Sequence, residues 1–416
     1  MSRLVMKFGG TSMADPERIR RVAALVAVEV GLGKRVAVVV SAMAGKTNEL
    51  VAWTDGAGPA AGGLDESDEE YDAVVASGEQ VTAGLLSMTL RNMGIAARSW
   101  MGWQVPIVTD DAHGRARIDE IPPARLLAAL EAGEVAVIAG FQGVTRDGRL
   151  TTLGRGGSDT TAVAVAATLK ASCCDIYTDV DGVYTTDPRI ESKARRLAAI
   201  SYEEMLEMAS LGAKVLHTRS VELAMAHGVP VRVLSSFAAA DGARSQGTVV
   251  CDEEEIVEKR IVSGVAYSRD EAKISLFGLP DHPGVSSELF GRLADANVNV
   301  DMIVQSHARG EGAANLEFTV SKRDAARAVD LVRAGREAIG FEDLAVNEDV
   351  AKVSVIGVGM RSHAGVAKTM FGALADKGVN IQVIATSEIK ISVLIDAAYT
   401  ELAVRALHAA YGLDQV

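Results

Sequence analysis

Apolar residues occur along the first half of this chain in short runs, separated by longer stretches with helical periodicity. The runs of strand length are Leu4–Phe8, Arg35–Ser41, Ala97–Ser99, Val105–Thr109, Val135–Gly140, Asp175–Asp179 and Val229–Ser235. Buried strands that alternate with helices predict a mostly parallel sheet with helices on both faces. Residues 1–237 are therefore expected to form an α/β domain, an αβα sandwich.

The pattern changes after residue 237. Residues 238–262 are mostly small, polar and acidic, which predicts a linker. Beyond it the sequence repeats, since Gly284 and Asn299 recur 81 residues later as Gly365 and Asn380. Each copy reads strand, glycine turn, helix, strand, strand, helix, the order of a ferredoxin-like βαββαβ unit. We place the two copies at 263–343 and 344–416.

Composition narrows the class of protein. A chain of 416 residues that is 48% hydrophobic and 23% charged is globular. Its net charge of −13 disfavours a nucleic-acid partner. Three cysteines, Cys173, Cys174 and Cys251, form no CxxC motif, and we expect them to be reduced core residues of a cytoplasmic protein. The sequence contains no signal-like start and no run of about 18 apolar residues, so we expect no membrane partner.

One acidic, glycine-rich segment interrupts the α/β pattern. Thr54–Glu70 is rich in Gly, Ala, Asp and Glu, and we predict a mobile insertion there. Two interpretations stay open, a solvated loop and a lid over a substrate.

Two glycine turns carry the candidate chemistry. Leu153–Thr161 combines three glycines, Arg155, Asp159 and three hydroxyls between a strand-like and a helix-like run. A helix start beside glycines offers free N–H groups to an anion, and an arginine suits a carboxylate. The second turn follows Leu4–Phe8, where Lys7 would be the countercharge of a phosphate bound by Gly9-Gly10-Thr11-Ser12.

These turns, together with Thr178–Arg189 and Gly212–His217, occur in an order and spacing that resemble the aspartate kinases of the amino-acid kinase family. The resemblance covers nearly the whole chain, and the two C-terminal copies resemble ACT domains. It implies transfer of a phosphoryl group from ATP, with Mg²⁺, to the β-carboxylate of L-aspartate, giving 4-phospho-L-aspartate. That reaction is the first step toward lysine, threonine and methionine, and the family implies feedback by lysine, threonine or both through the ACT domains.

The resemblance also implies roles for individual residues. The expected catalytic residues are Lys7, Asp159 and Lys214, where Asp159 organises the two lysines. The residues expected to contact the nucleotide are Lys7, Gly9, Gly10, Ser12, Thr178, Asp179, Tyr184, Arg189 and Lys214. Those expected to contact the substrate are Ser41, Thr47, Glu79, Arg155 and Ser158. Those expected to contact the effector are Asp281, Gly284, Asn299, Asp301, Gln305, Asn380, Ile381 and Ser387. We expect no metal site made of protein side chains, since no metal-binding spacing surrounds His217 or His227.

Several of these residues have a purely structural interpretation as well. Asp159 could cap a helix that starts near Thr161. Glu79 could be an ordinary first-turn glutamate at a helix dipole, and Ser41 and Thr47 could cap the helix that follows them. Arg189 could be a surface ion-pair partner.

Three other functions compete with aspartate kinase. The first is a P-loop nucleotide kinase, because Gly45-Lys46-Thr47 resembles the end of a P-loop. However, Val40 occupies the position of the first glycine of that motif. An enzyme of the same fold acting on acetylglutamate, glutamate or a nucleoside monophosphate would lack the tandem ACT copies. A non-catalytic amino-acid sensor would be expected to have lost Lys7, Arg155, Asp159 or Lys214.

The C-terminal copies also predict partners. Their edge strands and apolar helix faces favour a homodimer or a larger assembly. A separately translated regulatory chain is possible in such a family, although no methionine lies between Met225 and Met302. Asp281 has no counterpart in the second copy, where Ser362 stands, so we expect two unequal effector pockets.

Overall fold

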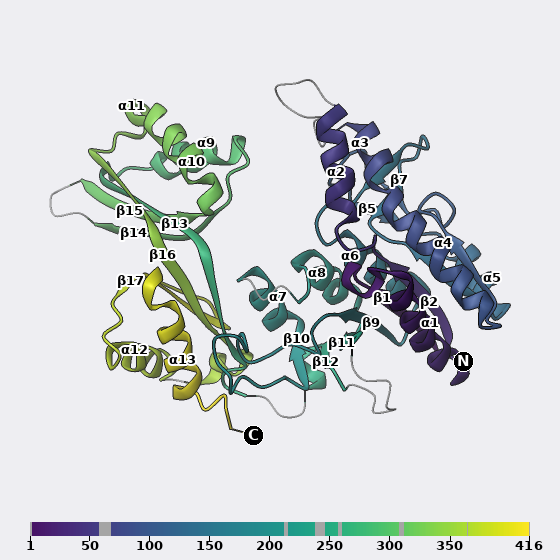
Figure 1. Cartoon of the computed structure of the whole chain (residues 1–416). Helices are drawn as coiled ribbons and strands as arrows, with labels where there is room; N and C mark the ends of the chain where they lie inside the picture. The colour runs from purple at the N-terminus through teal and green to yellow at the C-terminus, as the bar shows by residue number, and fades with distance from the viewer. Residues whose placement is uncertain are drawn as a thin grey trace. The chain divides into compact units, whose positions relative to one another are not determined.

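The computed structural model describes residues 2–57, 68–211, 215–237, 246–256, 260–307, 312–363 and 365–415 (Figure 1). The chain divides into two compact units. The first contains Met1–Val183 and Arg196–Glu258, and the second contains Tyr184–Arg195 and Lys259–Val416. In the described part of the chain, no helix combines the length and apolar character needed to cross a membrane.

An eight-stranded sheet forms the centre of the first unit, in the order β10-β12-β11-β9-β1-β2-β6-β3. The strands are β1 (Arg3–Phe8), β2 (Arg35–Val40), β3 (Ala97–Trp100), β6 (Val135–Ala139), β9 (Cys173–Thr178), β10 (Ala199–Ser201), β11 (Val231–Ser235) and β12 (Thr248–Cys251). Every neighbouring pair is parallel except β11 and β12. The predicted mostly parallel α/β sheet is confirmed.

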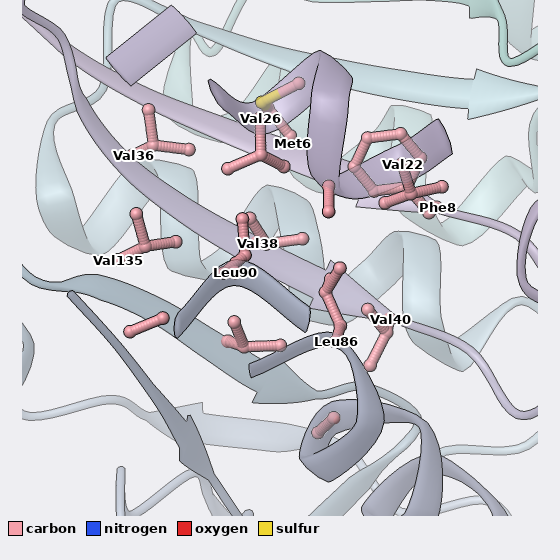
Figure 2. Close-up of a cluster of buried hydrophobic side chains, with 14 of the residues drawn as sticks. Met6, Phe8, Val22, Val26, Val36, Val38, Val40, Leu86, Leu90 and Val135 are labelled. Carbon is pink, nitrogen blue, oxygen red and sulfur yellow. The ribbon is translucent and has the colours of Figure 1, made fainter. Parts of the chain in front are cut away.

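Helices cover both faces of this sheet. They are α1 (Pro16–Gly31), α2 (Lys46–Ala57), α3 (Glu69–Val75), α4 (Ser77–Asn92), α5 (Ala124–Glu131), α6 (Gly157–Leu169), α7 (Tyr202–Ser210) and α8 (Thr218–His227). On one face, Val22 of α1 and Leu86 of α4 pack with Met6, Phe8 and Val38 of the strands (Figure 2). Strand side chains alternate between faces, so Lys7 points to the opposite face, where it meets Asp159 of α6.

A four-stranded sheet, in the order β5-β4-β7-β8, lies beside the main one in the chain's first unit. Its strands are β4 (Val108–Thr109), β5 (Ile118–Glu120), β7 (Gln142–Val144) and β8 (Leu150–Thr152). The strand predicted from Val105 is therefore shorter than expected, because residues 102–106 form turns. Short 3-10 helices complete the described elements: η1 (Gly10–Met13), η2 (Glu253–Glu255), η3 (Val358–Ser362) and η4 (Ala397–Tyr399).

The second unit is built on a six-stranded antiparallel sheet, in the order β14-β15-β13-β16-β18-β17. Its strands are β13 (Gly264–Pro280), β14 (Val300–His307), β15 (Ala313–Val320), β16 (Asp343–Ile356), β17 (Ile381–Thr386) and β18 (Lys390–Asp396). Its helices are α9 (Val285–Asp295), α10 (Lys322–Ala334), α11 (Arg336–Ile339), α12 (Val366–Ala375) and α13 (Thr400–Ala410). The two ferredoxin-like copies predicted from the repeat are confirmed.

Two long strands run through both copies. Residues 273–277 of β13 pair with the start of β16, next to α9 and α10. Residues 264–268 of β13 pair with the end of β16, whose other edge pairs with β18 of the second copy. The second copy therefore takes its fourth strand from residues 264–268, which lie inside the range 263–343 predicted for the first copy.

Local boundaries differ from the expectations at three places. Thr54 lies in α2 and Glu70 in α3, so both ends of the predicted insertion are helical, while 58–67 lie outside the described residues. Strand β12 lies within the predicted linker and extends the main sheet. Helix α6 begins at Gly157 and not at Thr161, directly after Gly156, whose left-handed conformation (φ 76°) is one that glycine adopts without strain. The three cysteines are free, as expected.

Candidate functional site

The candidate site lies where four neighbouring parallel strands end. Strands β9, β1, β2 and β6 are consecutive in the sheet, and their carboxyl ends lead into Thr178, Gly9, Ser41 and Gly140. Open α/β sheets bind ligands outside this edge of the sheet. The sequence motifs are thus brought together by the sheet, although they are far apart in the chain.

Lys7 and Asp159 form a buried ion pair at this edge. Lys7 Nζ lies 2.5 Å from Asp159 Oδ1. Both residues are less than a tenth exposed, at 8% and 7%. Asp159 is the third residue of α6 and its cap position is Gly156, so the helix-cap interpretation of Asp159 is wrong. An ion pair at a helix N-terminus places a lysine where a phosphate would also be favoured.

The glycine turn after β1 packs closely against the chain that follows β2. A Cβ atom at Gly10 would lie 3.0 Å from the carbonyl oxygen of Ala42, and one at Gly9 would lie 3.6 Å from Lys7 Nζ. Ser12 is buried, and its hydroxyl donates to Ser236 Oγ at 2.7 Å. Ser236 in turn donates to the carbonyl oxygen of Thr178 at 3.1 Å, which links the turn to the end of β9.

Sequence reasoning missed Ser236. It follows β11, the neighbour of β9, and parallel strands end at a common edge. Applying that rule to every predicted strand would have placed Ser236 among the candidates.

Glu79 is a buried carboxylate in the first turn of α4 and only 3% exposed. Its Oε1 accepts a hydrogen bond from the backbone N–H of Ala42 at 2.9 Å. Burial raises the pKa of Glu79 to about 7, although that hydrogen bond lowers it. Within the described part of the chain, Oε2 has no hydrogen-bond partner. A buried oxygen without a donor is suited to receive a cation such as an ammonium group.

The loop before α6 presents Arg155 to solvent. No acidic side chain among the described residues pairs with it. Ser158 is buried, and a Cβ at Gly140 would lie 3.0 Å from its hydroxyl. A Cβ at Gly156 would lie 2.3 Å from Cγ of His217, so this histidine packs against the loop as expected. Burial lowers the pKa of His217, which keeps the ring neutral at pH 7.

The two hydroxyls predicted after β2 lie in different local environments. The backbone N–H of Ser41 donates to Phe8 O at 3.1 Å, which holds it at the strand edge. Thr47 is the second residue of α2, inside the helix.

The predicted nucleotide residues divide between the two units. Thr178 and Asp179 belong to the first unit, where the Thr178 hydroxyl donates to Asp179 Oδ1 at 3.1 Å. Tyr184 and Arg189 belong to the second. Arg189 is 89% exposed and pairs with Asp187, with Nη2 and Oδ2 2.8 Å apart. The surface ion pair considered for Arg189 is therefore present.

One catalytic candidate cannot be placed. Lys214 and the rest of Gly212–Lys214 lie outside the described residues.

The first ferredoxin-like copy contains a pocket of about 350 Å³. Three of the predicted effector residues line it, namely Asp281, Gly284 and Gln305. Oδ2 of Asp281 lies 3.5 Å from Nδ1 of His307. A pocket of this size can hold an amino acid.

The remaining effector candidates lie elsewhere in the second unit. Asp301 pairs with Lys352 at 2.6 Å, and Ile381 packs in the core of the second copy. Asn299 and Asn380 are exposed just before β14 and β17, and Ser387 lies in the turn before β18.

Among the described residues, no group of three or more His, Cys, Asp or Glu side chains could hold a metal ion.

Comparison with known proteins identifies the family to which this chain belongs. The family model described as the amino acid kinase family matches residues 2–235, and the ACT domain model matches 274–334 and 353–411. An aspartokinase of Pseudomonas aeruginosa is 52% identical over 100% of this chain and 98% of its own length. The chain belongs to the aspartate kinases of the amino acid kinase family.

Solved structures of aspartate kinases agree with this fold. Aspartokinase III of E. coli in complex with aspartate and ADP, in the R-state, is 31% identical with a TM-score of 0.80, covering 98% of this chain and 99% of its own. The same enzyme in complex with lysine and aspartate, in the T-state, is 32% identical with a TM-score of 0.77, covering 98% of both chains. As an aspartate kinase, the chain is a phosphotransferase with a carboxyl group as acceptor.

Proposed function

We propose that this aspartate kinase transfers the terminal phosphoryl group of ATP to the β-carboxylate of L-aspartate and is inhibited by an amino acid bound to its ACT copies. The observation that carries the acceptor assignment is the buried Glu79 with its unpartnered Oε2. Glu79 would take the α-ammonium of the acceptor, and Arg155 would take its α-carboxylate. Ser41, Thr47 and Ser158 complete the proposed acceptor contacts.

The donor side rests on Lys7. Its ammonium group lies beside the glycine turn and is held by Asp159, so it is oriented before a phosphate arrives. Gly9, Gly10 and Ser12 would supply the cradle, with Thr178, Asp179, Tyr184, Arg189 and Lys214 as further nucleotide contacts. The β-carboxylate of aspartate is ionised at pH 7, so the reaction needs no general base.

Mg²⁺ fits this site only as a companion of the nucleotide. Asp159, the buried carboxylate that contacts Lys7, is engaged in the ion pair, and Mg²⁺ in kinases is bound mainly by phosphates and water. When bound, it would neutralise part of the phosphate charge. Lys7 and Lys214 would supply the remaining cationic groups.

Lysine, threonine or both are the proposed effectors. Support comes from the pocket with Asp281 in the first copy and from the E. coli relative, whose structure contains lysine. Inhibition would follow if the effector binds an inactive arrangement better than an active one. The proposal also includes a homodimer or a larger assembly, the latter with or without a separately translated regulatory chain. It further includes a cytoplasmic location and a place at the start of lysine, threonine and methionine synthesis.

The test measures ADP release from MgATP with L-aspartate, L-glutamate or N-acetyl-L-glutamate, each with and without lysine plus threonine. We expect turnover with aspartate and with neither of the other two acceptors, and we expect lysine plus threonine to lower this turnover. Turnover with another acceptor would overturn the substrate, and turnover unaffected by lysine and threonine would overturn the effectors.

A further inference from the structure

Asp72 is a fully buried carboxylate in α3 that lies outside the site described above. Its two oxygens accept hydrogen bonds from three groups. The backbone N–H of Gly114 donates at 3.1 Å, the His113 ring lies at 2.7 Å through Nδ1, and the hydroxyl of Thr152 donates to Oδ1. These hydrogen bonds to one buried carboxylate fix the relative positions of helix α3, the His113–Gly114 turn and Thr152.

Two of these donors support the loop that carries Arg155. Thr152 is the last residue of β8 and immediately precedes Leu153–Gly157. Gly114 presses against the same loop from the side, since a Cβ at Gly154 would lie 3.0 Å from Gly114 O. Asp72 therefore acts on this loop directly through Thr152 and indirectly through Gly114.

The other side of the loop is held by α8. Arg219 donates through Nη1 to Leu153 O at 2.7 Å and through Nη2 to Ala116 O at 2.8 Å. The start of the loop is thus fixed between α3 and α8, while Arg155 itself remains exposed at its tip.

Asp72 is also rigidly connected to Glu79. Helices α3 and α4 meet at Ala76, whose carbonyl oxygen accepts from the buried Gln142 side chain at 3.0 Å. One fixed helix pair thus carries Glu79 toward Ala42 and Asp72 toward Thr152.

We propose that Asp72 is a positioning residue for the acceptor amino acid, because it sets the Arg155 loop relative to Glu79. This inference rests on the proposed roles of Glu79 and Arg155 in binding the α-ammonium and α-carboxylate groups. Asp72 touches neither substrate, so its effect is on the geometry of acceptor binding and not on the nucleotide.

The test compares three threonine variants of the full chain in steady-state kinetics. Thr152→Val removes the hydroxyl that donates to Asp72 at nearly constant volume. We expect it to raise the KM for aspartate about 10- to 100-fold, the loss typical of a displaced substrate contact, and to change the KM for ATP by less than about twofold. Thr152→Ser restores the donor and should restore the acceptor KM.

Thr151→Val is the matched control. Thr151 is equally buried in the same strand, but its hydroxyl pairs with Thr109 at 2.7 Å and does not contact Asp72. A merely structural effect would appear in Thr151→Val and Thr152→Val alike, and such a result would overturn the inference. An acceptor KM that Thr152→Val leaves within twofold of the parent would overturn it as well.

Asp72→Asn tests the same hydrogen bond from the side of the acid, and it replaces Thr152→Val if that variant does not fold. It should also raise the acceptor KM selectively, and equal changes in both KM values would contradict the proposal.

Glu79→Gln and Arg155→Lys distinguish a failure of the proposed binding roles from a failure of the positioning role of Asp72. If these two leave the acceptor KM unchanged, the proposed binding roles fail; if they raise it while the Thr152 and Asp72 variants do not, only the positioning role fails.

Discussion

At the scale of single residues, the role proposed for Glu79 predicts that the binding of aspartate depends on pH. Burial raises the pKa of this carboxyl to about 7 in the ligand-free chain. An ammonium group binds the ionised form, so the neutral form must first lose its proton. We therefore expect the KM for aspartate to rise as pH falls below 7, about tenfold per pH unit well below the pKa. Initial rates between pH 6 and 9 measure this, and a KM independent of pH would contradict it.

The same carboxylate destabilises the ligand-free fold. Its folded pKa of about 7 lies above the ordinary glutamate pKa of 4.5, so the unfolded chain ionises first as pH rises. The cost begins above pH 4.5, grows until about pH 7 and is then constant. Glu79→Gln should thus raise the free energy of unfolding at pH 8 by on the order of 3 kcal/mol, and by much less near pH 4.5.

Denaturant unfolding of both proteins at the two pH values measures this difference. The variant should at the same time lose affinity for aspartate. A variant that is less stable than the parent at pH 8 would show that Oε2 of Glu79 also has a partner in the free chain, besides the Ala42 N–H that Oε1 accepts from.

At the scale of elements, the long strands of the second unit share a charge cluster in which Lys352 and Glu271 are buried and Asp301 is exposed. Lys352 of β16 lies 2.7 Å from Glu271 of β13 and 2.6 Å from Asp301 of β14. Burial opposes the charge of Lys352, but the two carboxylates outweigh it and raise the pKa of its ammonium group. Asp301, proposed as an effector contact, is thereby tied to the strands that join both copies.

Removing Lys352 alone should be costly. Lys352→Met leaves the buried Glu271 carboxylate without its cation, and we expect a loss of about 3–5 kcal/mol in the stability of the second unit. Changing Glu271→Gln as well should recover much of it. Lys273→Met is the control, because Lys273 and Glu317 are 3.4 Å apart and more exposed, and such pairs contribute about 0–1 kcal/mol.

Calorimetry of the full chain can follow the transition of the second unit in these variants. Equal losses in Lys352→Met and Lys273→Met would mean that burial of the cluster does not determine its energetic weight.

The elements show what the sequence could and could not predict. The alternation of apolar runs predicted the main sheet, and the repeated Gly284 and Gly365 predicted two ferredoxin-like copies, because these patterns are local. The sharing of β13 between the copies is a pairing between distant segments, and nothing within residues 264–268 encodes it. Lys7 and Glu79 were recognisable from motifs, whereas Asp72 and Ser236 stand alone in the sequence and gain meaning only through their partners.

At the scale of the whole chain, the two units are joined through a segment with predicted function. Tyr184–Arg195 lies in the chain between strands of the first unit, yet it belongs to the second. Asp187 accepts from the hydroxyl of Tyr267 in β13 at 3.1 Å, and the hydroxyl of Thr185 lies 2.9 Å from the His408 ring of α13. Two residues proposed as nucleotide contacts, Tyr184 and Arg189, therefore belong to the same unit as the pocket proposed for the effector.

The pocket proposed for the effector in the first copy provides a test of feedback inhibition. Asp281 is exposed at its rim and is suited to an ammonium group, whereas the second copy has Ser362 at the corresponding position. Asp281→Ala should raise the concentration of lysine or threonine needed for half-inhibition by about tenfold or more, since a charged hydrogen bond contributes about 1.5–3 kcal/mol. The uninhibited rate should stay unchanged, because Asp281 belongs to the second unit and not to the strand edge that carries Lys7 and Glu79.

The matched control is Asp270→Ala, because Asp270 is an exposed acid of the same unit away from the pocket. An inhibition curve that Asp281→Ala leaves unchanged would assign the effector to a different pocket, and a lowered basal rate would mean that this copy supports catalysis even without effector.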